Sequence, residues 1–257
     1  MPTNQTIKYI HSLRQKKYRD IHKQFVAEGV KIVSALMNGY FHIDRIYATS
    51  EWMESHSDAA QEYNAIPVKQ NELKKLSSLK TPNQVLAVAD FPGNPAKEHL
   101  SEETHIIALD NIQDPGNMGT IIRIADWFGI RHIICSETTV DCYNPKVVQA
   151  TMGSIGNVRT IYTDLATFLD QHPDRKIYGA CLQGISLYEE TFDEKGIIVF
   201  GNESAGISET IAERLDQQIY IPHFPPYERK ADSLNVSVSV GIICSEIRRG
   251  AHEFFLE

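Results

Sequence analysis

The sequence predicts an α/β protein of two domains, the second of which is built on a mostly parallel sheet. Two observations carry this prediction. Helical patterns separate short apolar runs along most of the chain. One segment rich in proline, glycine and charge, 91–103, divides the 257 residues into two parts that are each long enough for a core. We therefore expect a first domain at 1–90, a linker at 91–103 and a second domain at 104–257.

The first domain alternates between helices and strands. A helical start precedes an apolar strand that runs into a second helix, and Asn38-Gly39 ends that helix. Asn71 is the expected N-cap of a later helix. The expected helices are 4–12, 30–38, 51–63 and 71–79, and the expected strands are 25–29, 43–48, 66–68 and 84–89. In the second domain, strands are expected at 106–109, 132–135, 158–161, 176–181, 197–201 and 218–221.

Charge is unevenly distributed along the chain. The net charge of −8 argues against a protein that coats nucleic acid nonspecifically. Residues 1–35 nevertheless hold seven basic and two acidic side chains, a net charge of +5, whereas the remainder holds 18 basic and 31 acidic ones, a net charge of −13. This basic arm suits a specific contact with a polyanion, and a solvated helix face is the alternative. The candidate contacts are Arg14, Lys16, Lys17, Arg19 and Lys23.

Composition limits the cofactors and the compartment. The four cysteines form no CxxC pair, and the ten histidines show no zinc-ligand spacing. We therefore expect reduced thiols, no metal and a cytoplasmic protein. No apolar run approaches the length of a membrane span, and the N-terminus lacks the apolar region of a signal peptide.

The most informative segment lies at 111–123, directly after the apolar run 106–109. A strand, a turn rich in proline and glycine, and a helix are the layout of a ligand loop in an α/β domain. The loop contains neither G-x-G-x-x-G nor G-K-[ST], so a nucleotide-type ligand would be held in another way. Asn117 is the expected N-cap of the helix, and Gly129 is expected at its C-terminal end.

Two further motifs follow strands of the second domain. The strand 197–201 runs into Gly201-Asn-Glu203, where glycine lets backbone amides approach a ligand closely. Glu203 is either a ligand-loop carboxylate or an exposed turn residue. The third motif, Ser233 to Asn235, opens a segment whose alternation predicts a strand and whose length and basic end predict a helix.

Together these motifs resemble those of the SpoU family of RNA 2′-O-ribose methyltransferases, within the SPOUT superfamily. Asn117 and Arg123 are similar to its first signature, and the loop from Glu203 to Gly206 is similar to its second. The Ser-Leu-Asn that begins at Ser233 matches its third signature, and 144–153 resembles the family segment between the first two. The resemblance covers about residues 104–249. Three motifs in order are far more specific than any one of them.

The resemblance implies features that composition could not show. It implies a deep trefoil knot in the C-terminal domain, against the general rule that chains do not thread loops. It implies S-adenosylmethionine as methyl donor, a homodimer with the site near its interface, and a helix at 233–249. It also implies that the N-terminal domain is similar to the ribosomal-protein-L30e-like substrate-binding domain that many members carry.

The resemblance also assigns roles to residues. Arg123 is implied as the central catalytic group, either as the base or as a cation that grips phosphate and stabilises the developing alkoxide. The second role suits a guanidinium, which is normally always charged. The other implied catalytic residues are Asn117, Glu203, Ser233 and Asn235. The implied cofactor contacts are Phe200, Gly201, Asn202, Gly206, Ile221 and Leu234. The candidate RNA contacts remain those of the basic arm, Arg14, Lys16, Lys17, Arg19 and Lys23.

One departure from the family and several alternatives remain at this level. Typical members continue Ile-Pro-Met into a glycine-bearing loop, whereas this chain has His223, no glycine and a few added residues at 223–232. That loop either contacts RNA or forms a repacked cofactor lid. Ribosomal RNA is the expected substrate, with transfer RNA as the alternative. The complete set of catalytic residues disfavours an inactive RNA-binding protein, and the missing dinucleotide fingerprint disfavours an oxidoreductase.

Overall fold

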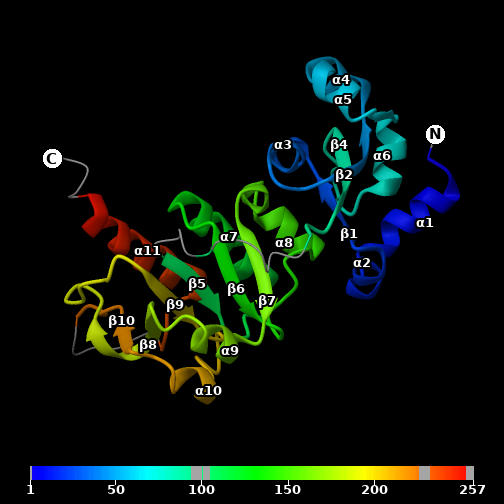
Figure 1. Cartoon of the computed structure of the whole chain (residues 1–257). Coiled ribbons are helices and arrows are strands. Elements are labelled where there is room, and N and C mark those ends of the chain that lie inside the picture. The colour runs from blue at the N-terminus through cyan, green and yellow to red at the C-terminus, as the bar shows by residue number, and fades with distance from the viewer. Residues whose placement is uncertain (1, 94–99, 101–104, 226–231, 253–257) are drawn as a thin grey trace. The chain divides into compact units, whose positions relative to one another are not determined.

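The computed structural model describes residues 2–93, 100, 105–225 and 232–252. Contacts divide the chain into two compact units, each with its own sheet (Figure 1). Unit 1 comprises Met1–Lys97 and Asp141–Asn157, and unit 2 comprises Glu98–Val140 and Val158–Glu257. The chain therefore passes between the units three times.

Unit 1 is built on a mixed sheet with the strand order β1-β4-β2-β3. β4 runs antiparallel to β1 and β2, and β3 runs parallel to β2. The strands are β1 (Gln24–Glu28), β2 (Ile43–Ala48), β3 (Ile66–Pro67) and β4 (Val85–Asp90). The helices are α1 (Asn4–Ser12), α2 (Lys16–His22), α3 (Val30–Asn38), α4 (Ser50–Ser55), α5 (Ser57–Glu62), α6 (Gln70–Leu76) and α8 (Pro145–Ala150), with the short 3-10 helix η3 (Ser154–Gly156).

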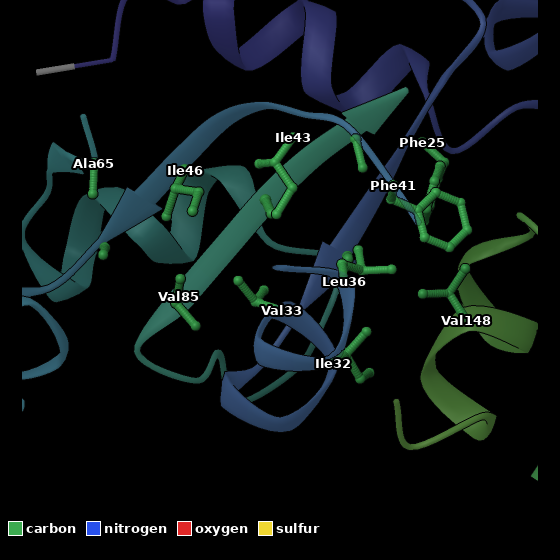
Figure 2. Packing of buried hydrophobic residues seen from close by; sticks show 14 of the residues in the cluster. Phe25, Ile32, Val33, Leu36, Phe41, Ile43, Ile46, Ala65, Val85 and Val148 are labelled. Carbon is green, nitrogen blue, oxygen red and sulfur yellow. The ribbon is translucent and has the colours of Figure 1, made fainter. Parts of the chain in front are cut away.

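Two apolar clusters form the core of unit 1. Because side chains alternate along a strand, Phe25 of β1 joins one cluster and Val26 joins the other. Figure 2 shows the first cluster, which includes Leu36 of α3 and Val148 of α8. Each large apolar side chain that is fully buried contributes roughly 1.5–3 kcal/mol to folding. Burial of this kind, rather than helix propensity, holds the short helices of unit 1 in place.

Residues 141–157 pack into unit 1 although they follow a strand of unit 2. The Tyr143 ring lies 4.3 Å from that of Phe91 and 4.7 Å from that of Phe25, measured between centroids. Gly156 approaches α3 so closely that a Cβ added to it would lie 2.4 Å from the Ala35 carbonyl oxygen. The sequence segmentation puts these residues in the second domain, but their contacts lie with unit 1 because their apolar side chains complete its core.

Unit 2 is built on a parallel sheet with the strand order β10-β8-β9-β5-β6-β7. Its strands are β5 (His105–Leu109), β6 (His132–Ser136), β7 (Arg159–Thr163), β8 (Lys176–Ser186), β9 (Gly196–Phe200) and β10 (Gln217–Tyr220). Its helices are α7 (Pro115–Trp127), α9 (Leu165–Asp170), α10 (Glu209–Ala212) and α11 (Val236–His252). Each expected strand is present within a few residues of its predicted position.

Both faces of this sheet are covered. Ile106 and Ala108 of β5 pack with Phe168 of α9 and Ile211 of α10. α7 and α11 pack against each other, and Arg248 Nε of α11 donates to the Phe128 carbonyl at the end of α7, at 2.8 Å. Within the described ranges, no helix combines the length and the hydropathy that a membrane span requires.

Two helices of unit 1 differ from the prediction. The helix expected at 51–63 is divided into α4 and α5, because the His56 backbone leaves the helical region at φ −134° and ψ 48°. α6 begins at Gln70, so Asn71 is not its N-cap, and Glu72 accepts instead from the Lys69 amide at 2.8 Å. The linker expected at 91–103 lies mostly outside the described residues.

Candidate active site

Three loops leave the carboxyl edge of the parallel sheet side by side. β5 and β9 are neighbours, so the loops that follow Leu109 and Phe200 start next to each other. β6 lies on the other side of β5, and its loop follows Ser136. Parallel strands thus bring segments that are far apart in the sequence to one edge, where ligands of α/β proteins bind.

The first loop ends at α7, and its cap differs from the prediction. Asp114 is the N-cap, since its Oδ1 accepts from the Asn117 amide at 2.8 Å, and Pro115 occupies the first helical position. The prediction that Asn117 caps this helix was therefore wrong. Its side chain is not used by the helix end and is available to other loops. Gly129 follows the helix with a φ of 66°, as expected of a C-terminal glycine.

The Asn117 side chain connects all three motifs. Its Nδ2 donates to Glu203 Oε1 at 2.8 Å, and its Oδ1 accepts from Asn235 Nδ2 at 2.9 Å. An amide that donates on one side and accepts on the other fixes the orientation of both partners. Three of the side chains predicted to be catalytic are thus in one hydrogen-bonded row.

The second loop is closed by its own backbone. Asn202 and Gly206 exchange two backbone hydrogen bonds of 2.9 Å, and Asn202 Oδ1 accepts from two further amides of the loop. A Cβ added to Gly201 would lie 2.2 Å from the Gly206 carbonyl carbon, so only glycine fits there. Gly206 has a φ of 73°, with nothing within 4 Å of the place its Cβ would take. Hydrogen bonds therefore fix the turn that carries Glu203, and the space next to Gly206 is open.

The third motif precedes a helix rather than a strand. α11 buries Val240, Ile243, Cys244 and Ile247, which follow helical spacing, so the alternation in the sequence is misleading. Asn235 is its cap, because Oδ1 accepts from the amide of residue 237 at 3.0 Å. The same side chain thus caps α11 with its oxygen and contacts the first loop with its nitrogen.

The remaining predicted residues of unit 2 lie outside this row. Arg123 and Ser233 are exposed, and in the part of the chain that the structure describes Arg123 makes no hydrogen bond or ion pair. Phe200 is only 1% exposed, so it can offer a ligand little more than its backbone. Leu234 is 50% exposed and Ile221 is partly buried, which leaves apolar surface next to the motif loops.

Sequence reasoning missed two polar residues of the first loop. The Asn111 backbone has a φ of 60°, a conformation that asparagine tolerates, and its carbonyl accepts from Asn202 Nδ2 at 2.9 Å. Gln113 Nε2 donates to Asn111 Oδ1 at 2.6 Å and to the Thr138 carbonyl at 2.7 Å. The available signal was an asparagine directly after a buried strand, where a left-handed residue is often needed.

Shifted pKa values in unit 2 lie away from the three motifs. Burial, followed by the Arg248 charge, lowers the pKa of His105 to about 4. Burial raises the pKa of the Cys244 thiol to about 12, which keeps it protonated and unreactive. None of the four cysteines forms a disulfide, and no group of three potential metal ligands occurs among the described residues.

The basic arm of unit 1 contains one residue that cannot contact RNA as expected. Arg19 is only 2% exposed; its Nε and Nη2 donate to Asp141 Oδ2 at 3.0 and 2.5 Å. Its Nη1 donates to the carbonyls of Leu13 and Arg14. The expectation for Arg19 is corrected, because the fold uses its whole guanidinium. The other four candidates are exposed, namely Arg14, Lys16, Lys17 and Lys23.

Known proteins match this chain in sequence and in fold. The model of the SpoU rRNA Methylase family matches residues 104–245, which is more than half of the chain. This chain belongs to that family. The model of the MRM3-like substrate binding domain matches residues 4–87. The family and the α/β fold predicted from the sequence are therefore confirmed.

Relatives match over almost the whole length of the chain. The 23S rRNA (guanosine(2553)-2′-O)-methyltransferase RlmP of Bacillus subtilis is 28% identical, and the match covers 95% of this chain and 96% of RlmP. A structure of a TrmH-family protein from Porphyromonas gingivalis is 35% identical, with a TM-score of 0.85 over 97% of this chain and 99% of that one. The AdoMet-bound rRNA methyltransferase from Sinorhizobium meliloti is 28% identical, with a TM-score of 0.86 over 97% and 96%.

Proposed function

We propose that this protein is an S-adenosylmethionine-dependent 2′-O-ribose methyltransferase of structured RNA, with ribosomal RNA as substrate. The observation that carries the proposal is the row in which Asn117 contacts both Glu203 and Asn235. Side chains of all three SpoU motifs meet there. The substrate class is supported by relatives named as 23S rRNA 2′-O-methyltransferases, RlmP of Bacillus subtilis and RlmB of Neisseria meningitidis.

The loops fit a nucleoside-type methyl donor. Gly201 and Gly206 form a closed turn whose exposed side no Cβ obstructs, so backbone groups of that turn can reach a ligand. Ile221 and Leu234 offer apolar surface to a flat ring. We assign donor binding to these residues together with Asn202 and the backbone of Phe200. Bound there, the donor would supply a methyl group carried on a positively charged sulfonium sulfur.

Arg123 is the residue to which we assign electrostatic stabilisation. A guanidinium stays charged in proteins and grips phosphate with several donors, so it can bind the phosphate next to the target ribose and stabilise the developing alkoxide. Arg123 is exposed on α7, so those donors are available to RNA. A neutral arginine acting as the base would require the loss of that charge.

The other motif residues orient the reacting groups. Asn117 holds Glu203 and Asn235 in fixed directions, so substrate contacts through these side chains need little rearrangement. To Ser233, which is exposed just before the cap of α11, we assign a hydrogen bond to the ribose hydroxyl. The side chains of this row thus position the nucleophile, while the arginine balances charge.

The assembly and the location complete the proposal. We infer a homodimer, because Trp127 at the end of α7 is 84% exposed and Val238 on α11 is 49% exposed, and a second copy would cover such apolar side chains. We also propose the family's trefoil knot in unit 2, and a cytoplasmic location, which suits four cysteines that form no disulfide. Light scattering of the purified protein tests the dimer directly.

RNA binding is assigned to unit 1 and to one loop of unit 2. Lys16, Lys17 and Lys23 expose three positive charges along α2 and its end, and Arg14 lies just before that helix. In the loop at 223–232, Phe224 is 93% exposed and is suited to stack on a base, whereas 226–231 lie outside the described residues.

The test is methyl transfer from labelled S-adenosylmethionine to unmodified ribosomal RNA and to unmodified transfer RNA, in separate reactions. We expect label in ribosomal RNA at a site that resists alkaline cleavage, which identifies ribose as the acceptor, and no label with Arg123→Ala. Label in transfer RNA alone would replace the substrate and keep the activity. Confirmed donor binding without label in either pool would refute the proposed reaction on free RNA.

A further inference from the structure

The first loop, between β5 and α7, is called the catalytic loop. It is hydrogen-bonded to the segment that connects β6 to unit 1. Four hydrogen bonds join this segment to the catalytic loop and the end of β5. Two of them use backbone groups of Asn111 and Ile112. The Asn111 amide donates to Ser136 Oγ at 2.9 Å, and the Val140 amide donates to the Ile112 carbonyl at 2.8 Å. We name the segment 136–140 the strap.

Side chains supply the other two bonds. Thr139 Oγ1 of the strap donates to the Leu109 carbonyl at 3.2 Å, and Thr139 is buried. Gln113 Nε2 donates to the strap at the Thr138 carbonyl and to Asn111 Oδ1. Gln113 therefore contacts both the strap and the turn of the catalytic loop.

The turn held by Gln113 bears directly on the motif row. Asn111 has a left-handed backbone, and its carbonyl accepts from Asn202, whose own oxygen closes the Glu203 loop. Asparagine tolerates such a conformation, and the hydrogen bonds to Ser136 and Gln113 hold Asn111 in it. A change at the strap thus reaches Asn111, then Asn202, and then the loop that carries Glu203.

At its other end the strap continues into unit 1. Val140 is the last residue of unit 2 before the crossing, and the next residue, Asp141, forms the buried ion pair with Arg19. Asp141 Oδ1 also accepts from the Tyr143 amide at 2.8 Å, and the Tyr143 ring is stacked in the core of unit 1. The strap is thus anchored in the unit that the family comparison identifies as substrate-binding.

We propose that the strap couples the substrate-binding unit to the catalytic loop, with Gln113 as the positioning residue at one end and the Arg19–Asp141 ion pair as the anchor at the other. The proposal rests on the proposed function, because it assigns RNA to unit 1 and methyl transfer to unit 2. Its chemical content is simple. RNA bound to unit 1 stabilises the strap, and the strap keeps Asn111 in the conformation that the motif row needs.

Gln113 allows a sharp test because it is exposed and its replacement does not endanger the core. In Gln113→Glu the side chain keeps its shape but turns an oxygen toward two oxygen acceptors, whereas Gln113→Lys keeps a donor. We expect Gln113→Glu and Gln113→Ala to lower kcat about tenfold at unchanged donor affinity and unchanged KM for RNA, with partial recovery in Gln113→Lys. The control is Gln171→Ala, an exposed glutamine at the end of α9, at the opposite edge of the sheet.

The coupling itself is tested by combining Gln113→Ala with Asp141→Asn in a double-mutant cycle. If both residues act through one strap, the double variant is no slower than the slower single variant. Additive losses in kcat would overturn the coupling and leave two independent local contacts. Thermal unfolding of Asp141→Asn separates slow catalysis from a loss of folded protein.

Amide hydrogen exchange decides the inference even if the protein methylates no RNA. In Asp141→Asn we expect the amides of Asn111 and Val140, which bond across the two loops, to exchange about tenfold faster, while amides in the centre of α7 are unchanged. Unchanged exchange at Asn111 and Val140 would overturn the strap. Normal exchange effects without any methyl transfer in the wild type would instead refute the proposed function alone.

Discussion

Polar residues serve different purposes in the two units. In unit 2, Asn117 is released from helix capping by Asp114, and its amide connects two other loops. In unit 1, Arg19 lies in the most basic part of the chain, yet the fold encloses its guanidinium completely. The chemical type of a side chain therefore does not decide whether it is available to bind a ligand or is used to stabilise the fold. What decides is whether the local fold already uses its hydrogen bonds.

The largest effect that this comparison predicts is at Arg123. Arg123→Ala should lower turnover about a thousandfold, because the charge that balances the transition state is lost. Stability and donor affinity should not change, since the side chain is exposed. Steady-state methylation, calorimetry of donor binding and thermal unfolding measure the three quantities. Arg131→Ala, an exposed arginine before β6, is the matched control, and equal activity of the two variants would refute the assignment.

Arg19 should behave in the opposite way. Arg19→Ala leaves Asp141 without its buried partner and should lower the free energy of unfolding by about 3 kcal/mol. Lys16→Ala on the same helix should change it by less than ~0.5 kcal/mol. Urea denaturation followed by circular dichroism measures both. If Arg19→Ala were as stable as wild type but bound RNA weakly, Arg19 would be an RNA contact after all.

Stability should also depend on pH through His105. Its folded pKa of about 4 lies below the ordinary value of 6.5, so protons favour the unfolded chain. The contribution is therefore fully present above pH 6.5 and is lost as the pH falls toward 4, with about 2 kcal/mol lost by pH 5. Urea titrations at pH 7 and 5 measure this difference. His105→Gln cannot titrate, so an equal pH dependence in that variant would assign the effect to other groups.

The smallest effect concerns the exposed lysines of unit 1. Replacing Lys16, Lys17 and Lys23 by Gln should weaken RNA binding and reduce the slope of log K against log salt by about 2 to 3, one for each lost phosphate contact. Filter binding at several salt concentrations measures the slope. A double Gln replacement of Lys74 and Lys75 on α6 is the control for charge alone. Equal slopes in the wild type and the triple variant would indicate that the basic arm is a solvated helix face that does not contact RNA.

Much of the fold was predictable because periodicity and turn residues are local signals. The strands of both units and the helix at 30–38 lie where the pattern puts them. The ambiguous segment after Ser233 shows the limit, because Leu234, Val236, Val238 and Val240 alternate as in a strand. Only packing decides its structure, through residues further along, such as Ile243 and Ile247, that become buried once the helix forms.

The sequence predicts which residues belong to the candidate site, but not how their side chains contact one another. The three motifs identify Asn117, Glu203 and Asn235, but nothing local shows that one asparagine would contact the other two. Asn111 and Gln113 were missed since their role depends on the strap, which follows a different strand. The burial of Arg19 was equally invisible, because its partner Asp141 lies 122 positions further along the chain.

The packing of 141–157 into unit 1 also orders the events of synthesis. Domains of a nascent chain generally fold as they emerge, the first one before the second. Here the first unit lacks Tyr143, Val148 and Ile155 of its own core until residue 157 has been made. By then β5 and β6 of the second unit have also been synthesised. The order of residues in this chain therefore delays the completion of unit 1 until the first two strands of unit 2 have been synthesised.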